Sequence, residues 1–191
     1  SSLTRIPVAV DIADASERDF DIIWDADEKA LCQWTCGDSR HIVEAIGGRH
    51  DFLFTCPPYA DLEVYSDDER DLSNMDYPEF LELYRHIADE SVKLLDNDAF
   101  AAVVVGEVRG KDGAYYNFVG DTIKAYMDAG MKYYNEIVLV TAVGSLPVRV
   151  TKQFQHSRKI GKTHQNILVF VKGDPVTAAY KCGRDETSGG E

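Results

Sequence analysis

The sequence predicts an α/β fold, in which helices flank a layered β-sheet. Residues 99–105 form a continuous apolar run of strand length, which is typical of a strand buried on both faces of a parallel sheet. Strand-length apolar runs follow at residues 137–140 and 167–171, and helical patterns separate the expected strands. Strands that alternate with helices indicate layers of helix on sheet.

The first elements are expected before residue 55. An apolar run at residues 31–34 indicates a strand, and Gly37-Asp38-Ser39 follows it. The amphipathic stretch 42–46 then predicts a short helix that ends at Gly47-Gly48, and the apolar run 52–54 predicts the next strand.

Two helices are expected further along the chain. Asp76, with Glu79 three residues later, is a helix-start signature, and apolar residues recur at helical spacing through Leu95. A second helix is predicted from about residue 117 to residue 129, where Gly130 stops it.

The length of 191 residues fits one domain with a sizeable core. We expect this domain to cover residues 1–180, with a divergent segment at 1–30 and a disordered polar tail at 181–191. The apolar runs are far too short to span a membrane, and no signal-peptide pattern is visible. We therefore expect a soluble cytoplasmic protein without a membrane partner.

The run Thr55-Cys56-Pro57-Pro58-Tyr59 directly follows the strand expected at residues 52–54. Two consecutive prolines fix two φ angles, remove two backbone donors and force the residue before each of them out of the helical region. The result is a stiff loop that presents carbonyl oxygens, a small side chain and an aromatic ring. A planar base suits this geometry, whereas the plainer interpretation is a rigid turn.

This run resembles the catalytic motif of the S-adenosylmethionine-dependent amino-methyltransferases of nucleic acids, in which Asp, Asn or Ser precedes Pro-Pro and an aromatic residue. The resemblance covers roughly residues 31–174. It implies a Rossmann-like methyltransferase sheet, S-adenosylmethionine as cofactor, and methylation of the exocyclic amine of adenine or cytosine in DNA. Acceptors on that amine help to localise its lone pair for attack on the sulfonium methyl, so positioning and electrostatics carry the rate.

The resemblance assigns Cys56, Pro57, Pro58 and Tyr59 to the catalytic loop. Cys56 and the Pro57 carbonyl would engage the amine, and Tyr59 would stack on the flipped-out base. Cys56 departs from the pattern because a thiol is a weak acceptor. With Thr55 in front, the run is most similar to the Thr-Ser-Pro-Pro-Tyr form of cytosine-N4 enzymes, but the exchange of Ser for Cys leaves the target base open. A covalent role for Cys56 is disfavoured, because in cytosine-C5 methylases the Cys follows a proline.

The resemblance further implies cofactor contacts for Asp38, Ser39 and Thr55. In the family an acidic residue at the place of Asp38 meets the adenine moiety of the cofactor, and the plain alternative is that Asp38 caps the following helix. The family's glycine-rich cofactor loop, which lets backbone approach the methionine part, is not found in the sequence. The nearest candidate, residues 8–16, is either a degenerate loop or, as we favour, a strand followed by a turn.

Three explanations for the missing loop stay open. The chain is part of a longer methyltransferase, a partner chain or second copy supplies the loop, or cofactor binding has been lost. The third explanation gives the alternative function, a non-catalytic methyltransferase-like binding or assembly subunit. Similar sequences occur in phage-borne and bacterial DNA methylases, some of them fused to a ParB-like domain, which implies a role in DNA modification or restriction–modification.

The charge distribution combines an acidic body with one basic segment. The net charge of −13 argues against a simple nucleic-acid binder, because phosphate repels such a chain unless its positive charge is concentrated. Residues 149–164 contain no acidic residue. They contain five cations: Arg149, Lys152, Arg158, Lys159 and Lys162. We expect this segment, between the last two strands, to hold the DNA backbone. The plainer alternative is a solvated loop that balances the acidic residues 66–71.

Two further patterns lead to expectations about loops and metals. Residues 60–75 form a long polar loop that we interpret as a lid over the base pocket, with a short edge strand as the alternative. The four cysteines are too few and too unevenly spaced for a disulfide framework. Cys32, Cys36 and His41 lack a fourth ligand, so we expect buried free thiols and no metal site.

Overall fold

The computed structural model describes residues 37–59, 71–140 and 146–183, together with Thr35, Ala142 and Gly144. Several sequence-based expectations lie outside these residues. They concern the divergent N-terminal segment, the strand at 31–34, the candidate cofactor loop at 8–16, most of the expected lid and most of the expected tail.

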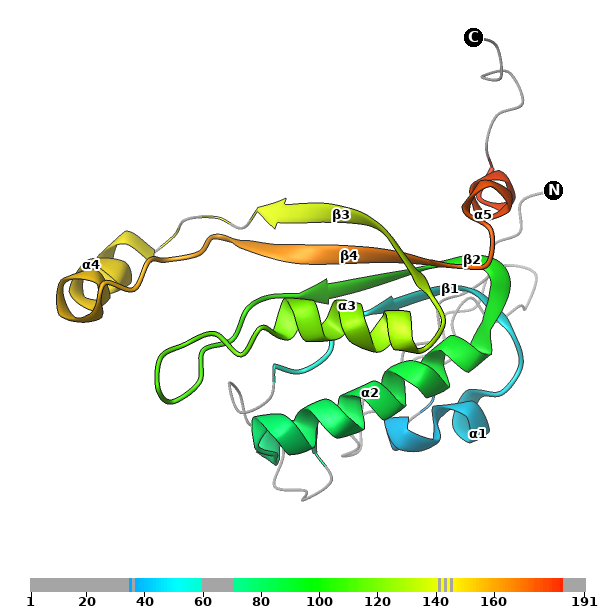
Figure 1. Ribbon diagram of the computed structural model, residues 1–191, viewed down its shortest axis with the longest axis horizontal. Helices are drawn as coiled ribbons and strands as arrows, with labels where there is room; N and C mark the ends of the chain where they lie inside the picture. The colour runs from blue at the N-terminus through cyan, green and yellow to red at the C-terminus, as the bar shows by residue number, and fades with distance from the viewer. Residues whose placement is uncertain are drawn as a thin grey trace, which may run out of the picture.

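Four strands form one mixed sheet: β1 (His50–Thr55), β2 (Leu95–Val105), β3 (Lys132–Val140) and β4 (His164–Lys172). The spatial order is β1-β2-β4-β3, with β1 parallel to β2, and β4 antiparallel to both β2 and β3 (Figure 1). The strands predicted at residues 52–54, 99–105, 137–140 and 167–171 are confirmed, with longer bounds. The expectation of a purely parallel setting for residues 99–105 was wrong on one side, because β2 has a parallel neighbour in β1 and an antiparallel neighbour in β4.

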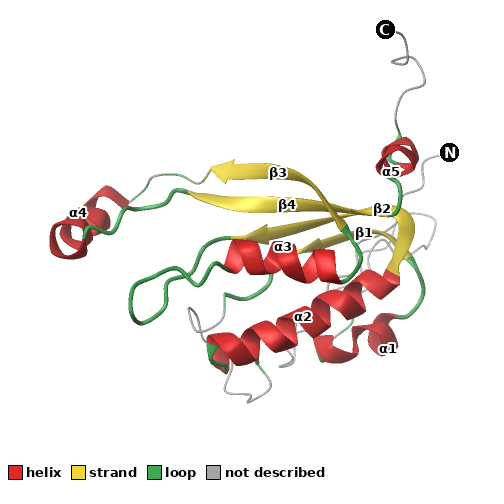
Figure 2. Cartoon of the chain, viewed as in Figure 1, coloured by secondary structure: helices red, strands yellow, loops and turns green. Residues whose placement is uncertain are grey.

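Two long helices cover one face of the sheet: α2 (Tyr77–Leu94) and α3 (Phe118–Asp128) (Figure 2). The other helices are η1 (Ser39–His41), α1 (Ile42–Ile46), η3 (Leu72–Asn74), α4 (Leu146–Ser157) and α5 (Pro175–Lys181). The predicted start of α2 is confirmed, since the Asp76 carboxylate accepts a hydrogen bond from the Glu79 N–H at 3.0 Å. Gly130, with φ of +93°, follows Ala129, the C-cap of α3, and stops the helix as predicted.

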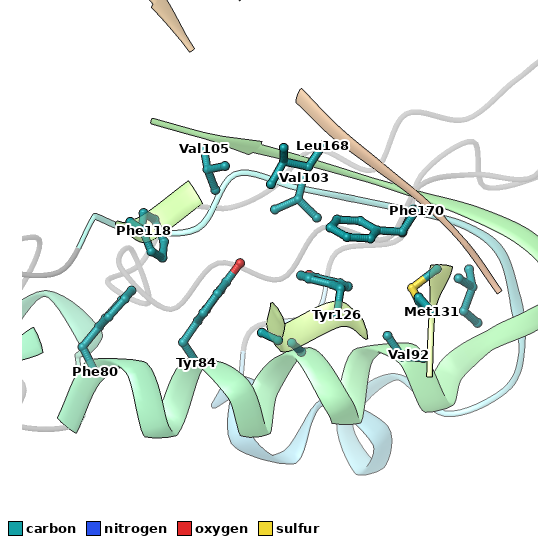
Figure 3. Close-up of a cluster of buried hydrophobic side chains, with 14 of the residues drawn as sticks. Phe80, Tyr84, Val92, Val103, Val105, Phe118, Tyr126, Met131, Leu168 and Phe170 are labelled. Atoms are coloured by element: carbon teal, nitrogen blue, oxygen red, sulfur yellow. The ribbon is translucent and has the colours of Figure 1, made fainter. Parts of the chain in front are cut away.

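The hydrophobic core lies between these two helices and the sheet (Figure 3). Phe80 and Tyr84 rise from α2, while Phe118 and Tyr126 come from α3. The sheet contributes alternate residues of β2 and β4 to the core: Ala101, Val103, Val105, Leu168 and Phe170. This alternation follows from the period of two in a strand, which sends every second side chain to the helix-covered face.

The opposite face of the sheet is apolar but has exposed side chains. Phe52 and Phe54 pair in register with Phe100 and Ala102 and are 52% and 61% exposed. On β3, Ile137 and other large apolar side chains are also exposed. In the sheet as described, β1 has a neighbouring strand on one side only. Parallel pairs normally have both faces covered, so this open face and edge distinguish the described part of the chain from a finished α/β sheet.

The basic segment differs from its expected loop form. Residues up to Ser157 continue α4, and only residues 158–163 form the link to β4. Leu146, Val150 and Phe154 recur at four-residue spacing, a helical signal that the charge-based argument passed over. Within the described chain, the search for a helix that could cross a membrane found none.

Candidate active site

The candidate site lies at the edge where three strands end. β1 and β2 are parallel, and β3 runs in the same direction because both β2 and β3 are antiparallel to β4. The Pro-Pro loop after β1, the loop after β2 and helix α4 after β3 therefore gather at one end of the molecule (Figure 1). In open α/β sheets, ligands bind outside the carboxyl ends of the strands.

Tyr59 is held at two points within this edge. Its hydroxyl oxygen accepts a hydrogen bond from Gln165 Nε2 at 2.7 Å, and its ring meets Phe118 edge-on, with centroids 5.9 Å apart and an interplanar angle of 78°. Gly106 lies beside the same ring, since a Cβ there would be 3.8 Å from Tyr59. The ring is half-buried, so its orientation is fixed by the fold before any ligand arrives.

Gln165 is a site residue that the sequence did not reveal. It lies near the start of β4, 106 positions after Tyr59, and β4 brings it alongside the end of β2 by antiparallel pairing. In the sequence, the only signal for Gln165 was its position next to His164, just before the strand predicted at residues 167–171. The pairing register decides which side chain of that run reaches Tyr59.

Cys56 lies at the start of the loop, and its residue surface is exposed. Desolvation around the sulfur raises the pKa of the Cys56 thiol, and a hydrogen bond with Tyr59 opposes this shift in part. At neutral pH the side chain is therefore a protonated thiol. Such a group donates or accepts only weak hydrogen bonds and is not an activated nucleophile.

Tyr84 belongs to the aromatic packing next to the Pro-Pro loop. It is buried against Phe118, with ring centroids 5.5 Å apart (Figure 3). Burial raises the pKa of the Tyr84 hydroxyl, and the nearby Tyr59 and Cys56 add smaller shifts in the same direction. The Pro-Pro loop thus rests on rigid aromatic packing, and Pro57 is itself buried.

Asp38 acts as a helix cap in the structure. Its carboxylate accepts a hydrogen bond from the Arg40 N–H at 3.0 Å and forms a salt bridge with the Arg40 guanidinium. These Arg40 hydrogen bonds are the main reason why the pKa of Asp38 is lowered. The Arg40 carbonyl accepts a hydrogen bond from the His86 ring at 3.2 Å. His86 lies two positions after Tyr84, which places it on nearly the opposite side of α2.

The described contacts therefore do not bring the predicted cofactor residues together. Asp38 and Ser39 lie beside the outer side of α2, whereas Thr55 ends β1 next to the Pro-Pro loop. A glycine-lined approach for the methionine part of S-adenosylmethionine is not found around Thr55 in the part of the chain that the structure describes. These residues alone do not form a complete S-adenosylmethionine site.

The basic segment places its cations at the site end of the molecule. Lys152 and Lys162 are exposed, and the Arg158 guanidinium lies over the Phe154 ring, 5.3 Å from its centroid. Lys159 packs on the loop after β2, because a Cβ on Gly113 would lie 2.9 Å from its Nζ. Arg149 lies within α4.

The expectation of no metal site stays a prediction. In the described residues, a search for clusters of three or more His, Cys, Asp or Glu that could hold a metal ion found none. His41 is exposed, whereas Cys32 and Cys36 lie outside the described residues.

Comparison with known proteins supports the assignment of the fold but does not show an activity. No protein-family profile and no curated protein matches the sequence. Among solved structures, TTHA0409 from Thermus thermophilus, named as a candidate DNA modification methylase, matches with a TM-score of 0.53 and 19% identity over 72% of this chain and 52% of its own. The same protein complexed with S-adenosyl-L-methionine matches with a TM-score of 0.51, at 19% identity over 72% of this chain and 54% of its own.

The matched fold defines the class of structure. This mixed α/β sheet with flanking helices matches the folds of S-adenosylmethionine-dependent methyltransferases. The chain is structurally similar, at low sequence identity, to solved structures named as candidate DNA modification methylases. It spans about half the length of the solved structures named above.

Proposed function

We propose that this chain forms the base-binding and catalytic half of an S-adenosylmethionine-dependent methyltransferase. Its substrate would be the exocyclic amine of adenine or cytosine in DNA. The single observation that supports this most is the Pro-Pro loop at the carboxyl end of β1, where Tyr59 is held between Gln165 and Phe118 within a methyltransferase-like sheet.

Each residue of the loop has a distinct task in this proposal. The preordered Tyr59 ring stacks on the extruded base, which offsets part of the cost of unstacking it. The Pro57 carbonyl is the stronger acceptor for the amine, since the protonated Cys56 thiol is a weak one. The cofactor, when bound, supplies an electrophilic methyl group to the amine nitrogen.

The cofactor site requires a structural unit beyond the described residues. The open edge of β1 and the exposed Phe52 and Phe54 lie where a further α/β layer would continue the sheet. The matched part of this chain covers only about half of each of these structures. We propose that this added unit, from a partner chain or second copy or from further polypeptide, brings the glycine-rich cofactor loop.

A second candidate function follows from the contacts of Asp38. The Asp38 carboxylate is already engaged by the Arg40 guanidinium and backbone N–H, which gives it a structural role. This observation favours a methyltransferase-like binding or assembly subunit. The two functions differ in whether methyl transfer depends on Tyr59.

Methyl transfer with labelled S-adenosylmethionine tests the proposal on the full chain. Single-stranded and duplex DNA and matched RNA serve as acceptors, and Tyr59→Ala and Tyr59→Phe are the test variants. We expect Tyr59→Ala to lower kcat/KM by about 5- to 150-fold, because base–aromatic stacking is worth about 1–3 kcal/mol. Tyr59→Phe keeps the ring and loses the Gln165 bond, so its loss should be smaller.

The control is Tyr180→Ala, because Tyr180 is an exposed aromatic residue on α5, which lies at the far end of the sheet (Figure 1). It should leave the rate unchanged. Calorimetry with S-adenosylmethionine accompanies the assay. If the wild-type chain neither binds millimolar cofactor nor transfers a methyl group, the stand-alone enzyme is excluded, and the binding subunit or an enzyme that needs the proposed added unit remains.

A further inference from the structure

The loop after β2 is a rigid hairpin that the proposed reaction does not use. Arg109 and Tyr115 pair as an antiparallel bridge, and the Gly110 N–H donates to the Ala114 carbonyl at 2.9 Å. The turn contains Gly113 with φ of +86°, a conformation that favours glycine. The Asp112 carboxylate accepts a hydrogen bond from the Ala114 N–H and closes the turn.

The hairpin is anchored to the core at its base. Tyr116 stacks on Tyr77 with centroids 4.1 Å apart and an interplanar angle of 5°. The Tyr77 hydroxyl donates to the Asp121 carboxylate on α3 at 2.7 Å. The position of the hairpin is therefore set by both helices that pack under the sheet.

The hairpin presents an exposed ring, that of Tyr115, beside a cation. The Arg109 guanidinium lies 3.9 Å from the centroid of the Tyr115 ring and donates to the Gly113 carbonyl at 2.8 Å. Tyr115 is 44% exposed. This cation–π pair and the backbone bond hold the ring in place before any ligand binds.

A second cation–ring pair lies on the neighbouring segment. Arg158 covers the Phe154 ring, which is 43% exposed, and Lys159 lies against Gly113 of the hairpin. The end of the molecule with the Pro-Pro loop thus carries two exposed rings, each paired with an arginine. Lys159 lies beside them. Rings of this kind stack on bases, and cations between them neutralise phosphates.

We propose that the hairpin 109–115 and the segment 154–160 form a binding site for unpaired nucleotides beside the target base. Tyr115 stacks on one base, and Arg109 and Lys159 contact the neighbouring phosphates. This inference rests on the proposed function for the nucleic-acid class of the ligand. An unpaired strand fits better than a duplex, because bases within a duplex have no free face for a ring, and the acidic body repels additional phosphates.

Fluorescence anisotropy with labelled single-stranded DNA of about 12 nucleotides tests the site, since such site sizes are typical for stacking platforms. The second probe is the same backbone made of abasic units. We expect Tyr115→Ala to weaken binding of the base-containing strand on the order of tenfold and to leave binding of the abasic strand nearly unchanged. Tyr115→Phe, which keeps the ring, should bind as the wild type does, and Tyr180→Ala is the matched control.

Lys159→Ala gives an independent readout. It should weaken both probes alike and reduce the slope of log K against log salt by about 1. Equal effects of Tyr115→Ala on the two single-stranded probes, no binding of either at low salt, or tighter binding of a duplex of the same sequence, measured as a third probe, would overturn the inference. Since these assays contain no S-adenosylmethionine, failure of methyl transfer with the expected binding pattern would reject the proposed reaction and leave this site in place.

Discussion

Cys56 is the residue at which the chain departs most from the methyltransferase motif. Its thiol stands where the family has an oxygen or amide acceptor, and desolvation keeps it protonated at neutral pH. A raised pKa lowers the fraction of thiolate at any given pH. The side chain therefore contributes shape and a weak hydrogen bond, while the Pro57 carbonyl carries the stronger interaction with an amine.

The raised pKa of Cys56 predicts slow alkylation. In a Cys32→Ser, Cys36→Ser, Cys182→Ser background, the reaction with iodoacetamide at pH 8 should be slower than that of free cysteine and should rise only at higher pH. Tyr59→Phe should shift the pH midpoint further upward, because the Tyr59 hydrogen bond lowers the pKa. A rate that levels off below pH 8 would contradict this prediction and reopen a covalent role.

At the scale of elements, the helix starts show how local chemistry sets boundaries. Asp76 caps α2 through the Glu79 N–H, and Asp38 caps η1 through the Arg40 N–H. Both caps satisfy backbone donors that the first turn of a helix leaves free. For Asp38, a salt bridge with Arg40 adds to the cap.

Asp38→Asn should lower the free energy of unfolding by about 1 kcal/mol at pH 7, because Asn keeps the cap but loses the ion pair. The folded pKa of Asp38 lies below its usual 3.8. Its stabilising effect is therefore fully present above about pH 4 and is lost as the pH falls through the folded value. Urea unfolding at pH 7 and pH 3 checks this, and the difference from wild type should shrink at pH 3.

A control for the Asp38 measurement is Glu82→Gln on the exposed surface of α2, which should show no such pH-dependent difference. Calorimetry on the same Asp38→Asn protein separates the two roles of the residue. A loss of stability with unchanged S-adenosylmethionine binding would assign Asp38 to its structural contacts with Arg40 alone. A loss of binding at full stability would assign it to the cofactor.

At the scale of the whole molecule, the sheet face opposite α2 and α3 stands out, because no described element covers it. Phe52 and Phe54 on β1 and Ile137 on β3 expose apolar surface, and β1 offers an open strand edge. Soluble monomers seldom leave such a patch open, since apolar patches of this kind mark interfaces.

The open face predicts self-association when the chain is purified alone. Sedimentation velocity should show species larger than one chain, and Phe52→Ser with Phe54→Ser should shift the distribution toward one chain. Stability should change little, because both rings are already exposed. Val176→Ser with Tyr180→Ser, on exposed positions of α5, is the control and should leave association unchanged. A strictly single-chain wild type would contradict the prediction.

The sequence by itself determined the strands at residues 52–54 and 99–105, the start of α2 at Asp76 and the stiff loop at residues 55–59. These features depend on neighbouring residues: an apolar run, a capping side chain or two prolines. The resemblance of that loop to a methyltransferase motif led to the correct fold class. It could not show whether Asp38 meets a cofactor, because capping and cofactor binding use the same residue type in the same place.

Only the tertiary structure decided the sheet order, the helical form of α4 and the contacts that build the site. Gln165 reaches Tyr59 across 106 positions, and Lys159 meets Gly113 across the end of the sheet. Such pairs depend on strand register, and a shift of one residue would turn every side chain of a strand to the other face. Local pattern therefore gives the elements, whereas long-range packing selects which side chains meet.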